Sequence, residues 1–162
     1  MKIIKPPHFI PNNLACVFLA GSIEMGAAEN WQDKITAMLD GTPWTVLNPR
    51  RDDWDSSWVQ SIGNPQFFEQ VNWELQGIEV AEHVIVYFDP STKSPITLME
   101  LGLLAGRSPE KAIVICPDGY WRRGNVQVVC DRYRMTQVSS LEGAISILNR
   151  ASFADRLPTS SK

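Results

Sequence analysis

Short apolar runs alternate along the chain with longer segments whose apolar residues recur at helical spacing. The runs predict strands at residues 15–20, 44–47, 84–88, 111–116 and 135–138. A continuously apolar run such as 84–88 is typical of a strand buried on both faces of a parallel sheet. The last run is less apolar, and we expect it at an edge of the sheet.

The segments between these runs predict helices at residues 27–39, 65–81, 97–105, 125–133 and 140–148. Two of them follow clear start signals, Asn64-Pro65 and Ser94-Pro95, in which a capping residue precedes a proline. Strands that alternate with helices predict an α/β fold, with helices on both faces of the sheet and right-handed crossovers. We therefore expect a doubly wound domain of the flavodoxin or Rossmann type, with a mostly parallel sheet of about five strands.

A chain of 162 residues suits one such domain, which we place at residues 15–150. Residues 1–14 contain several prolines and are expected to form an extended N-terminal arm. Residues 151–162 are expected to form a flexible C-terminal tail. No internal repeat or long linker divides the chain further.

Composition and charge exclude several classes of function. A net charge of −3 gives no support for nucleic-acid binding, and no segment approaches the length of a membrane span. Pro6-Pro7 interrupts any apolar stretch near the N-terminus, so we expect no secretory signal. The 3 cysteines and 2 histidines lack metal-ligand spacing. They predict free thiols in the reducing cytoplasm and no metal site.

Polar residues follow the predicted strands, at the edge where open α/β sheets bind their ligands. The candidate binding residues in these loops are Gly21, Ser22, Asn48, Arg50, Asp89, Ser94, Trp121 and Asn125. Such a mixture suits a polar ligand that contains a ring. The loops contain neither a complete GxGxxG pattern nor a P-loop, and neither histidine lies in them. A dinucleotide site or a Ser-His-Asp site is therefore not expected.

Glu100 is the strongest single candidate for chemistry. It lies in the early turns of the helix predicted after strand 84–88. A carboxylate there gains from the helix dipole, which is expected to keep it ionised and nucleophilic. However, Thr97 and Glu100 also fit a capping box, in which the glutamate only reaches back to a backbone N–H. The local sequence leaves both interpretations open.

Four short motifs occur in order between residues 15 and 133. They are Phe18-Leu-Ala-Gly-Ser-Ile23, Trp73-Glu74-Leu-Gln-Gly-Ile78, Ser94-Pro-Ile-Thr-x-x-Glu100-Leu-Gly102 and Arg122-Arg-Gly-Asn125. Each is weak alone. Together, in this order and on these predicted elements, they resemble the nucleoside 2-deoxyribosyltransferase family.

The resemblance implies an enzyme that cleaves the N-glycosidic bond of 2′-deoxynucleosides. Glu100 takes the place of the family's nucleophile, which forms a covalent deoxyribosyl-glutamate before the sugar passes to another nucleobase or to water. Glu74 matches the acid near the nucleobase, where aspartate is more usual. Asn125 matches an asparagine that reaches a neighbouring subunit's site, which implies a homo-oligomer with shared active sites. The implied partners are a small nucleoside or nucleotide and a free nucleobase, and the chemistry needs no cofactor.

Ser94 departs from the family pattern, which often has a sugar-binding aspartate at this place. A serine here resembles the 2′-deoxynucleoside 5′-phosphate N-hydrolases, in which it contacts phosphate. Gly21-Ser22 also resembles the phosphate loop of that branch, whereas Glu24 replaces an arginine and would repel a phosphate. Asp89 could substitute for the missing aspartate. A deoxynucleotide hydrolase is thus the alternative enzyme, and a non-catalytic nucleotide-binding module is a further alternative.

Other candidates also have purely structural interpretations. Arg50 and Arg51 suit a phosphate or a base, but with the aspartates that follow they would equally form exposed ion pairs. Trp121 could stack on a nucleobase or pack beneath its own loop. Ser22 and Asn125 could each cap a helix instead of contacting a sugar.

Overall fold

The computed structural model describes residues 2–23, 30–55 and 57–154. Its sheet has six parallel strands in the order β1-β3-β2-β4-β5-β6. The strands are β1 (Lys2–Ile4), β2 (Cys16–Gly21), β3 (Thr45–Leu47), β4 (His83–Tyr87), β5 (Ala112–Ile115) and β6 (Thr136–Val138). The doubly wound α/β fold is therefore confirmed. Part of the turn predicted after the first strand, and the start of the helix predicted at 27–39, lie outside the described residues.

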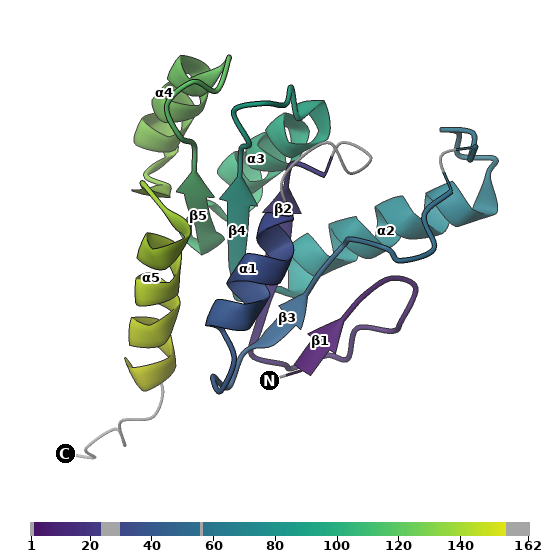
Figure 1. Ribbon diagram of the computed structural model, residues 1–162, viewed down its shortest axis with the longest axis horizontal. Helices are drawn as coiled ribbons and strands as arrows, with labels where there is room; N and C mark the ends of the chain where they lie inside the picture. Colours follow the sequence, from purple (N-terminus) through teal and green to yellow (C-terminus); the bar gives the residue numbers. More distant parts are fainter. Residues whose placement is uncertain (1, 24–29, 56, 155–162) are drawn as a thin grey trace.

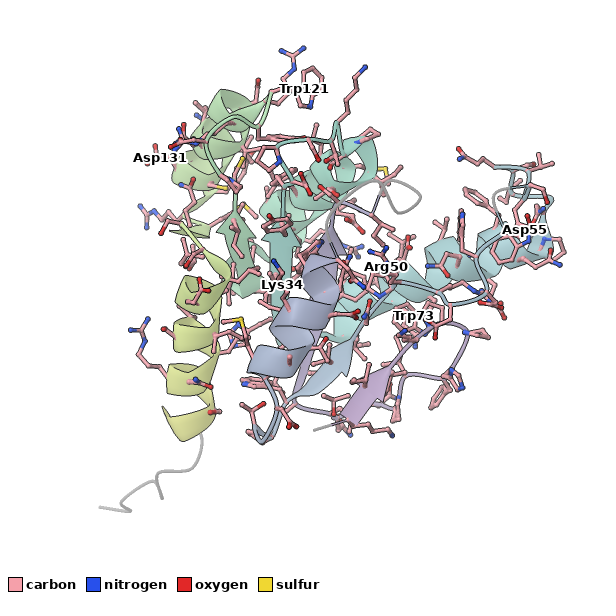
Figure 2. The ribbon with its side chains drawn as sticks, viewed as in Figure 1. Lys34, Arg50, Asp55, Trp73, Trp121 and Asp131 are labelled. Carbon is pink, nitrogen blue, oxygen red and sulfur yellow. The ribbon has the colours of Figure 1, made fainter. Side chains whose placement is uncertain are left out.

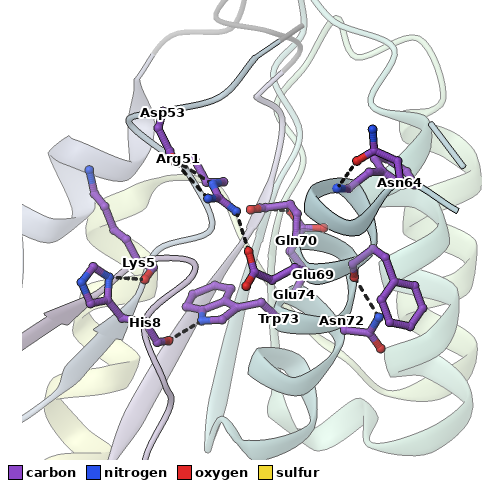
Figure 3. A network of polar contacts seen from close by, with 12 residues as sticks. Lys5, His8, Arg51, Asp53, Asn64, Glu69, Gln70, Asn72, Trp73 and Glu74 are labelled. Atoms are coloured by element: carbon purple, nitrogen blue, oxygen red, sulfur yellow. Dashed lines mark hydrogen bonds and ion pairs between the residues drawn. The ribbon is translucent and has the colours of Figure 1, made fainter. Parts of the chain in front are cut away.

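Strand β1 is the sixth strand, where about five were expected. It lies in the segment predicted as an extended arm and pairs with β3, Lys2 opposite Thr45. Only Ile4 of its three residues is buried, so its apolar signal is too short to predict a strand. The arm is also tied to the helix that follows β3, because Nε1 of Trp73 donates to the carbonyl of His8 at 2.8 Å (Figure 3).

Five helices cover the two faces of this sheet (Figure 1). Helices α1 (Trp31–Met38) and α5 (Leu141–Ala154) pack on one face, and α2 (Pro65–Val80), α3 (Pro95–Arg107) and α4 (Arg123–Tyr133) on the other. A short 3-10 helix, η2 (Pro109–Lys111), precedes β5. Helix α5 continues past Leu148, where it was predicted to end, so the helix extends into the segment predicted as a tail.

The strand order reverses beside β2, and this reversal locates the site. The chain passes from β2 to β3 on one side and later to β4 on the other side of β2. Connections that leave in opposite directions open a crevice at the carboxyl ends of two adjacent parallel strands. Ser22 directly follows β2, and Asp89 follows β4. Both residues therefore lie beside the expected crevice.

Helix α2 packs against β2 at Gly77, where a Cβ atom would lie 2.5 Å from Cδ2 of Phe18. We expect Gly77→Ala to lower the free energy of unfolding by about 1–3 kcal/mol, because this ring is enclosed in the core. Gly106 in α3 has open space around it, so Gly106→Ala should instead raise the free energy by about 0.5–1 kcal/mol. Urea unfolding measures both. Equal stabilities of the two variants would contradict this packing.

Candidate active site

Glu100 is buried in the second turn of α3, with 7% of its surface exposed. The helix begins at Pro95 with Ser94 as its N-cap residue, so the predicted capping box at Thr97 does not form. Within the described residues, no hydrogen bond or ion pair reaches the Glu100 carboxyl. A buried carboxyl without a protein partner destabilises the fold and is therefore a candidate for ligand chemistry.

Burial and, second, the negative charge of Glu74 raise the pKa of Glu100 to about 8 from the ordinary 4.5. The expectation that the helix dipole keeps Glu100 ionised is therefore wrong for the unliganded protein. The dipole acts mainly on the first turn, and here desolvation outweighs it.

Glu74 on α2 is the second carboxyl of the site. Burial raises its pKa, and a hydrogen bond from Gln70 lowers it. Gln70 lies one helical turn earlier and is 4% exposed (Figure 3). Its Nε2 donates to Oε1 of Glu74 at 2.7 Å and to the carbonyl of Pro49 at 3.0 Å. This contact joins α2 to the loop that follows β3.

Two adjacent arginines in this loop have different surroundings. Arg51 pairs with Asp53 at 2.8 Å and with Glu69 of α2 at 3.4 Å, so it ties the loop to the helix (Figure 3). The backbone N–H of Arg50 donates to Oδ1 of the buried Asn48 at 3.0 Å. Nη1 of Arg50 is buried and has no hydrogen-bond partner within the described part of the chain. Arg50 lies near the end of β3 (Figure 2). The predicted ion-pair role therefore applies to Arg51, and ligand contact by Arg50 stays a prediction.

Three buried hydroxyl groups meet where β2 and β4 end. Oγ1 of Thr92 lies 3.0 Å from Oγ of Ser22 and 2.6 Å from Oγ of Ser94. Ser22 and Ser94 also share a hydrogen bond, and Ser22 accepts the N–H of Asp89 at 3.0 Å. Ser94 has a left-handed backbone, φ 47°, and its side chain makes no capping hydrogen bond to α3. The Ser94 hydroxyl therefore joins the cluster and does not cap α3.

Asp89 and Gly21 have clear structural roles beside this cluster. Oδ1 of Asp89 accepts the N–H and the hydroxyl of Ser91 at 2.8 and 2.6 Å, which closes the turn after β4. A Cβ at Gly21 would lie 2.6 Å from the carbonyl oxygen of Tyr87 and 2.7 Å from the ring of Trp31. A glycine is thus required here for packing, and substrate contact by either residue stays a prediction.

Trp121 and Asn125 are exposed outside the buried group. Trp121 is 52% exposed, its Nε1 donates to the carbonyl of Lys93 at 3.1 Å, and the Arg122 guanidinium lies 4.2 Å from its ring centre (Figure 2). Asn125 lies in the first turn of α4, whose N-cap residue is Arg122, so it is not the cap. Their contact with a substrate also stays a prediction.

The structure thus gathers most predicted site residues at the carboxyl ends of β2, β3 and β4. Sequence reasoning missed Gln70 and Thr92. Gln70 could have been found as the residue four positions before Glu74, because such pairs meet on a helix. Thr92 carries no comparable signal, since only the folded loop brings its hydroxyl to Ser22.

A separate crevice of about 470 Å³ lies at the ends of β5 and β6, where Cys116, Arg123 and Gln137 line it. None of the predicted site residues borders it. In the described part of the chain, no group of three or more His, Cys, Asp or Glu side chains could hold a metal ion. No described helix is long and apolar enough to span a membrane.

A comparison with known protein families matches residues 15–120 with the family described as nucleoside 2-deoxyribosyltransferase like. The match spans β2 to β5 and includes Glu74 and Glu100. The chain belongs to this family. The nucleoside 2-deoxyribosyltransferase-like match confirms the resemblance seen in the motifs, although it ends before Trp121 and Asn125. Among curated proteins, no significant match to the chain was found.

The raised pKa of Glu100 predicts that stability depends on pH. Glu100 ionises near 4.5 when unfolded and near 8 when folded, so the folded state loses stability as pH rises between these values. Glu100→Gln has no proton to lose. We expect the thermal stability of the variant to exceed that of the wild type by about 2–4 kcal/mol at pH 8, at about 1.4 kcal/mol per pKa unit.

At pH 5 this advantage should be much smaller, because the folded carboxyl is then protonated. Thermal unfolding at both pH values measures the difference. Glu110→Gln removes an exposed carboxyl and is the matched control. An advantage for Glu100→Gln that does not grow from pH 5 to pH 8 would contradict the buried state of this carboxyl.

Proposed function

We propose that this protein cleaves the N-glycosidic bond of 2′-deoxynucleosides and transfers the sugar to another nucleobase or to water. The observation that carries this proposal is the buried Glu100 carboxyl, which has no hydrogen-bond or ion-pair partner among the described residues and lies near the partly buried carboxyl of Glu74. Retaining glycosyl transfer uses two carboxyls in this way, one as nucleophile and one as acid and base. The family supports the substrate class.

In the first step, the Glu100 carboxylate attacks C1′ while the bond from C1′ to the base nitrogen breaks. The electron pair of that bond leaves with the base, and protonated Glu74 supplies its proton. The products are a deoxyribosyl ester on Glu100 and an ionised Glu74. In the second step, Glu74 takes a proton from the incoming base or water, which attacks C1′ and releases Glu100. The configuration at C1′ is retained overall.

The two carboxyls suit this cycle electrostatically. Because each negative charge opposes the ionisation of the other, the pair loses its two protons in separate steps. Between these steps the pair holds one proton. The negative charge of Glu74 raises the pKa of Glu100, so this proton lies on Glu100 at rest, and the attack requires that it first passes to Glu74. When the ester forms, Glu100 loses its charge and Glu74 gains one. The buried pair then carries one negative charge before and after the attack.

Two further buried groups suit a nucleobase. Oε1 of Gln70 is a buried acceptor and Nη1 of Arg50 is a buried donor, and neither has a hydrogen-bond partner among the described residues. Unpaired groups of this kind destabilise a protein unless a ligand satisfies them. A nucleobase has both N–H donors and oxygen or nitrogen acceptors. We propose that the hydroxyl cluster of Ser22, Thr92 and Ser94 binds the sugar of the nucleoside.

We further propose a homo-oligomer with shared active sites in the cytoplasm. Asn125 supports shared sites because it is exposed on α4 and is therefore accessible to a second subunit. Native mass spectrometry would give the number of subunits, and a monomer would exclude sharing.

A deoxynucleoside 5′-monophosphate N-glycosidase is the second candidate. Two observations favour it: the Ser94 hydroxyl makes no capping hydrogen bond to α3, and Nη1 of Arg50 has no hydrogen-bond partner among the described residues. Uncapped helix N-termini and arginines both bind phosphate. Glu24, which would repel a phosphate, lies outside the described residues.

Glu100→Ala tests the proposed nucleophile. Wild type, given a deoxynucleoside and a second free base, should form the exchanged nucleoside. We expect Glu100→Ala to lower this rate by about 1,000-fold or more while the protein stays folded, and Glu110→Gln to keep it. Mass spectrometry after brief exposure to the deoxynucleoside should find a deoxyribosyl adduct on the peptide that contains Glu100. Full activity of Glu100→Ala would end both enzyme proposals.

Donor preference separates the two candidates. If the protein is a transferase for nucleosides, a 5′-phosphate should not raise kcat/KM, and Arg50→Gln should affect both donors equally. The hydrolase would instead release deoxyribose 5-phosphate from the monophosphate without an acceptor base. Arg50→Gln should then reduce kcat/KM for the monophosphate about tenfold more than for the nucleoside. Chromatography of the products measures both outcomes.

A further inference from the structure

Gln70 is the polar group most closely tied to the proposed acid. It lies one turn before Glu74 on α2, and both of its hydrogen bonds use the same nitrogen, Nε2. The acceptor in one of them is the carbonyl of Pro49, which can never donate. The orientation of the amide is therefore fixed by the backbone, and Gln70 always presents a donor to Oε1 of Glu74.

Glu74 has no other hydrogen bond within the described residues. One of its oxygens is thus held by the amide, and the other is left for a ligand. A donor fixed against a carboxyl oxygen favours the ionised form of that carboxyl, which opposes the effect of burial. The same amide therefore affects both where the carboxyl points and when it holds a proton.

We propose that Gln70 is a positioning residue for Glu74: it fixes one carboxyl oxygen, directs the other towards the leaving base and limits how firmly the carboxyl retains its proton. This inference rests on the proposed function of Glu74 as acid and base. It differs from a purely structural role, in which Gln70 would only join α2 to the loop after β3.

Gln70→Met tests the inference, because methionine keeps the length of the side chain and removes the amide. The charge coupled to Glu74 is that of Glu100 on α3. The neighbouring elements also carry Arg50 and Arg51 after β3 and Glu69 on α2, and all of them stay in place. Gln76→Met removes an exposed amide from the same helix and is the matched control. Carbon-13 NMR of the Glu74 carboxyl, assigned with Glu74→Gln, follows its titration without any need for activity.

We expect the titration midpoint of Glu74 to move to higher pH in Gln70→Met and to stay unchanged in Gln76→Met. The alkaline limb of the kcat/KM profile should move in the same direction, because Glu74 must be protonated to release the base. Maximal kcat should fall about tenfold or more, since the carboxyl is no longer held. If the loss of Gln70 only weakened the fold, turnover would fall without any movement of the midpoint or the limb.

If the midpoint stays at its wild-type value in a folded Gln70→Met protein, the inference is overturned. If the midpoint moves but wild type cleaves no deoxynucleoside, the inference about proton retention stands and the proposed function fails. Should Gln70→Met not fold, Gln70→Glu keeps the shape of the side chain. It replaces the donor with a second carboxyl, and the midpoint of Glu74 should again move to higher pH.

Discussion

The structure of the site depends on two neighbouring carboxyls, the buried Glu100 and the partly buried Glu74. Full ionisation of both would place two like charges together in a poorly solvated space, which is strongly unfavourable. The pair is therefore stable with at most one negative charge, and the raised pKa of Glu100 expresses this constraint. Glycosyl transfer by the proposed route moves that single charge from one carboxyl to the other and never adds a second. The same constraint that destabilises the folded protein at high pH thus suits the chemistry.

The fold holds these carboxyls together through two helices on one face of the sheet. Helix α2 is packed against β2 at Gly77, where Phe18 leaves no room for a side chain. Helix α3 starts at Pro95, and Ser94 turns its hydroxyl into the cluster with Ser22 instead of onto the helix end. The first contact fixes the position of Glu74, and the second fixes the start of the helix that carries Glu100. The two carboxyls therefore lie beside β2, where the strand order reverses.

The apolar runs were enough to predict the fold, because β2, β3, β4 and β5 are buried runs flanked by amphipathic helices. Strand β1 was missed because two of its three residues are exposed and its partner, β3, is distant in sequence. Motif order located Glu100 and Glu74, but their protonation could not be read from the sequence, since it depends on burial by other elements. The different roles of Arg50 and Arg51 could not be predicted from the sequence either, because only the folded loop brings Glu69 beside Arg51.

The position of Arg50 gives one more reason to favour acid and base chemistry at Glu74. A guanidinium paired with either buried carboxyl would stabilise the negative charge and lower the pKa. Glu74 could then no longer hold the proton that the leaving base requires. In the structure, the polar partner of Glu74 is the neutral amide of Gln70, which orients the carboxyl while adding no charge. Within the described residues, Nη1 of Arg50 has no hydrogen-bond partner, and no ion pair joins Arg50 to either carboxyl. A neutral partner for Glu74, without a paired cation, is what the proposed mechanism needs, because the proton must be retained until the base departs.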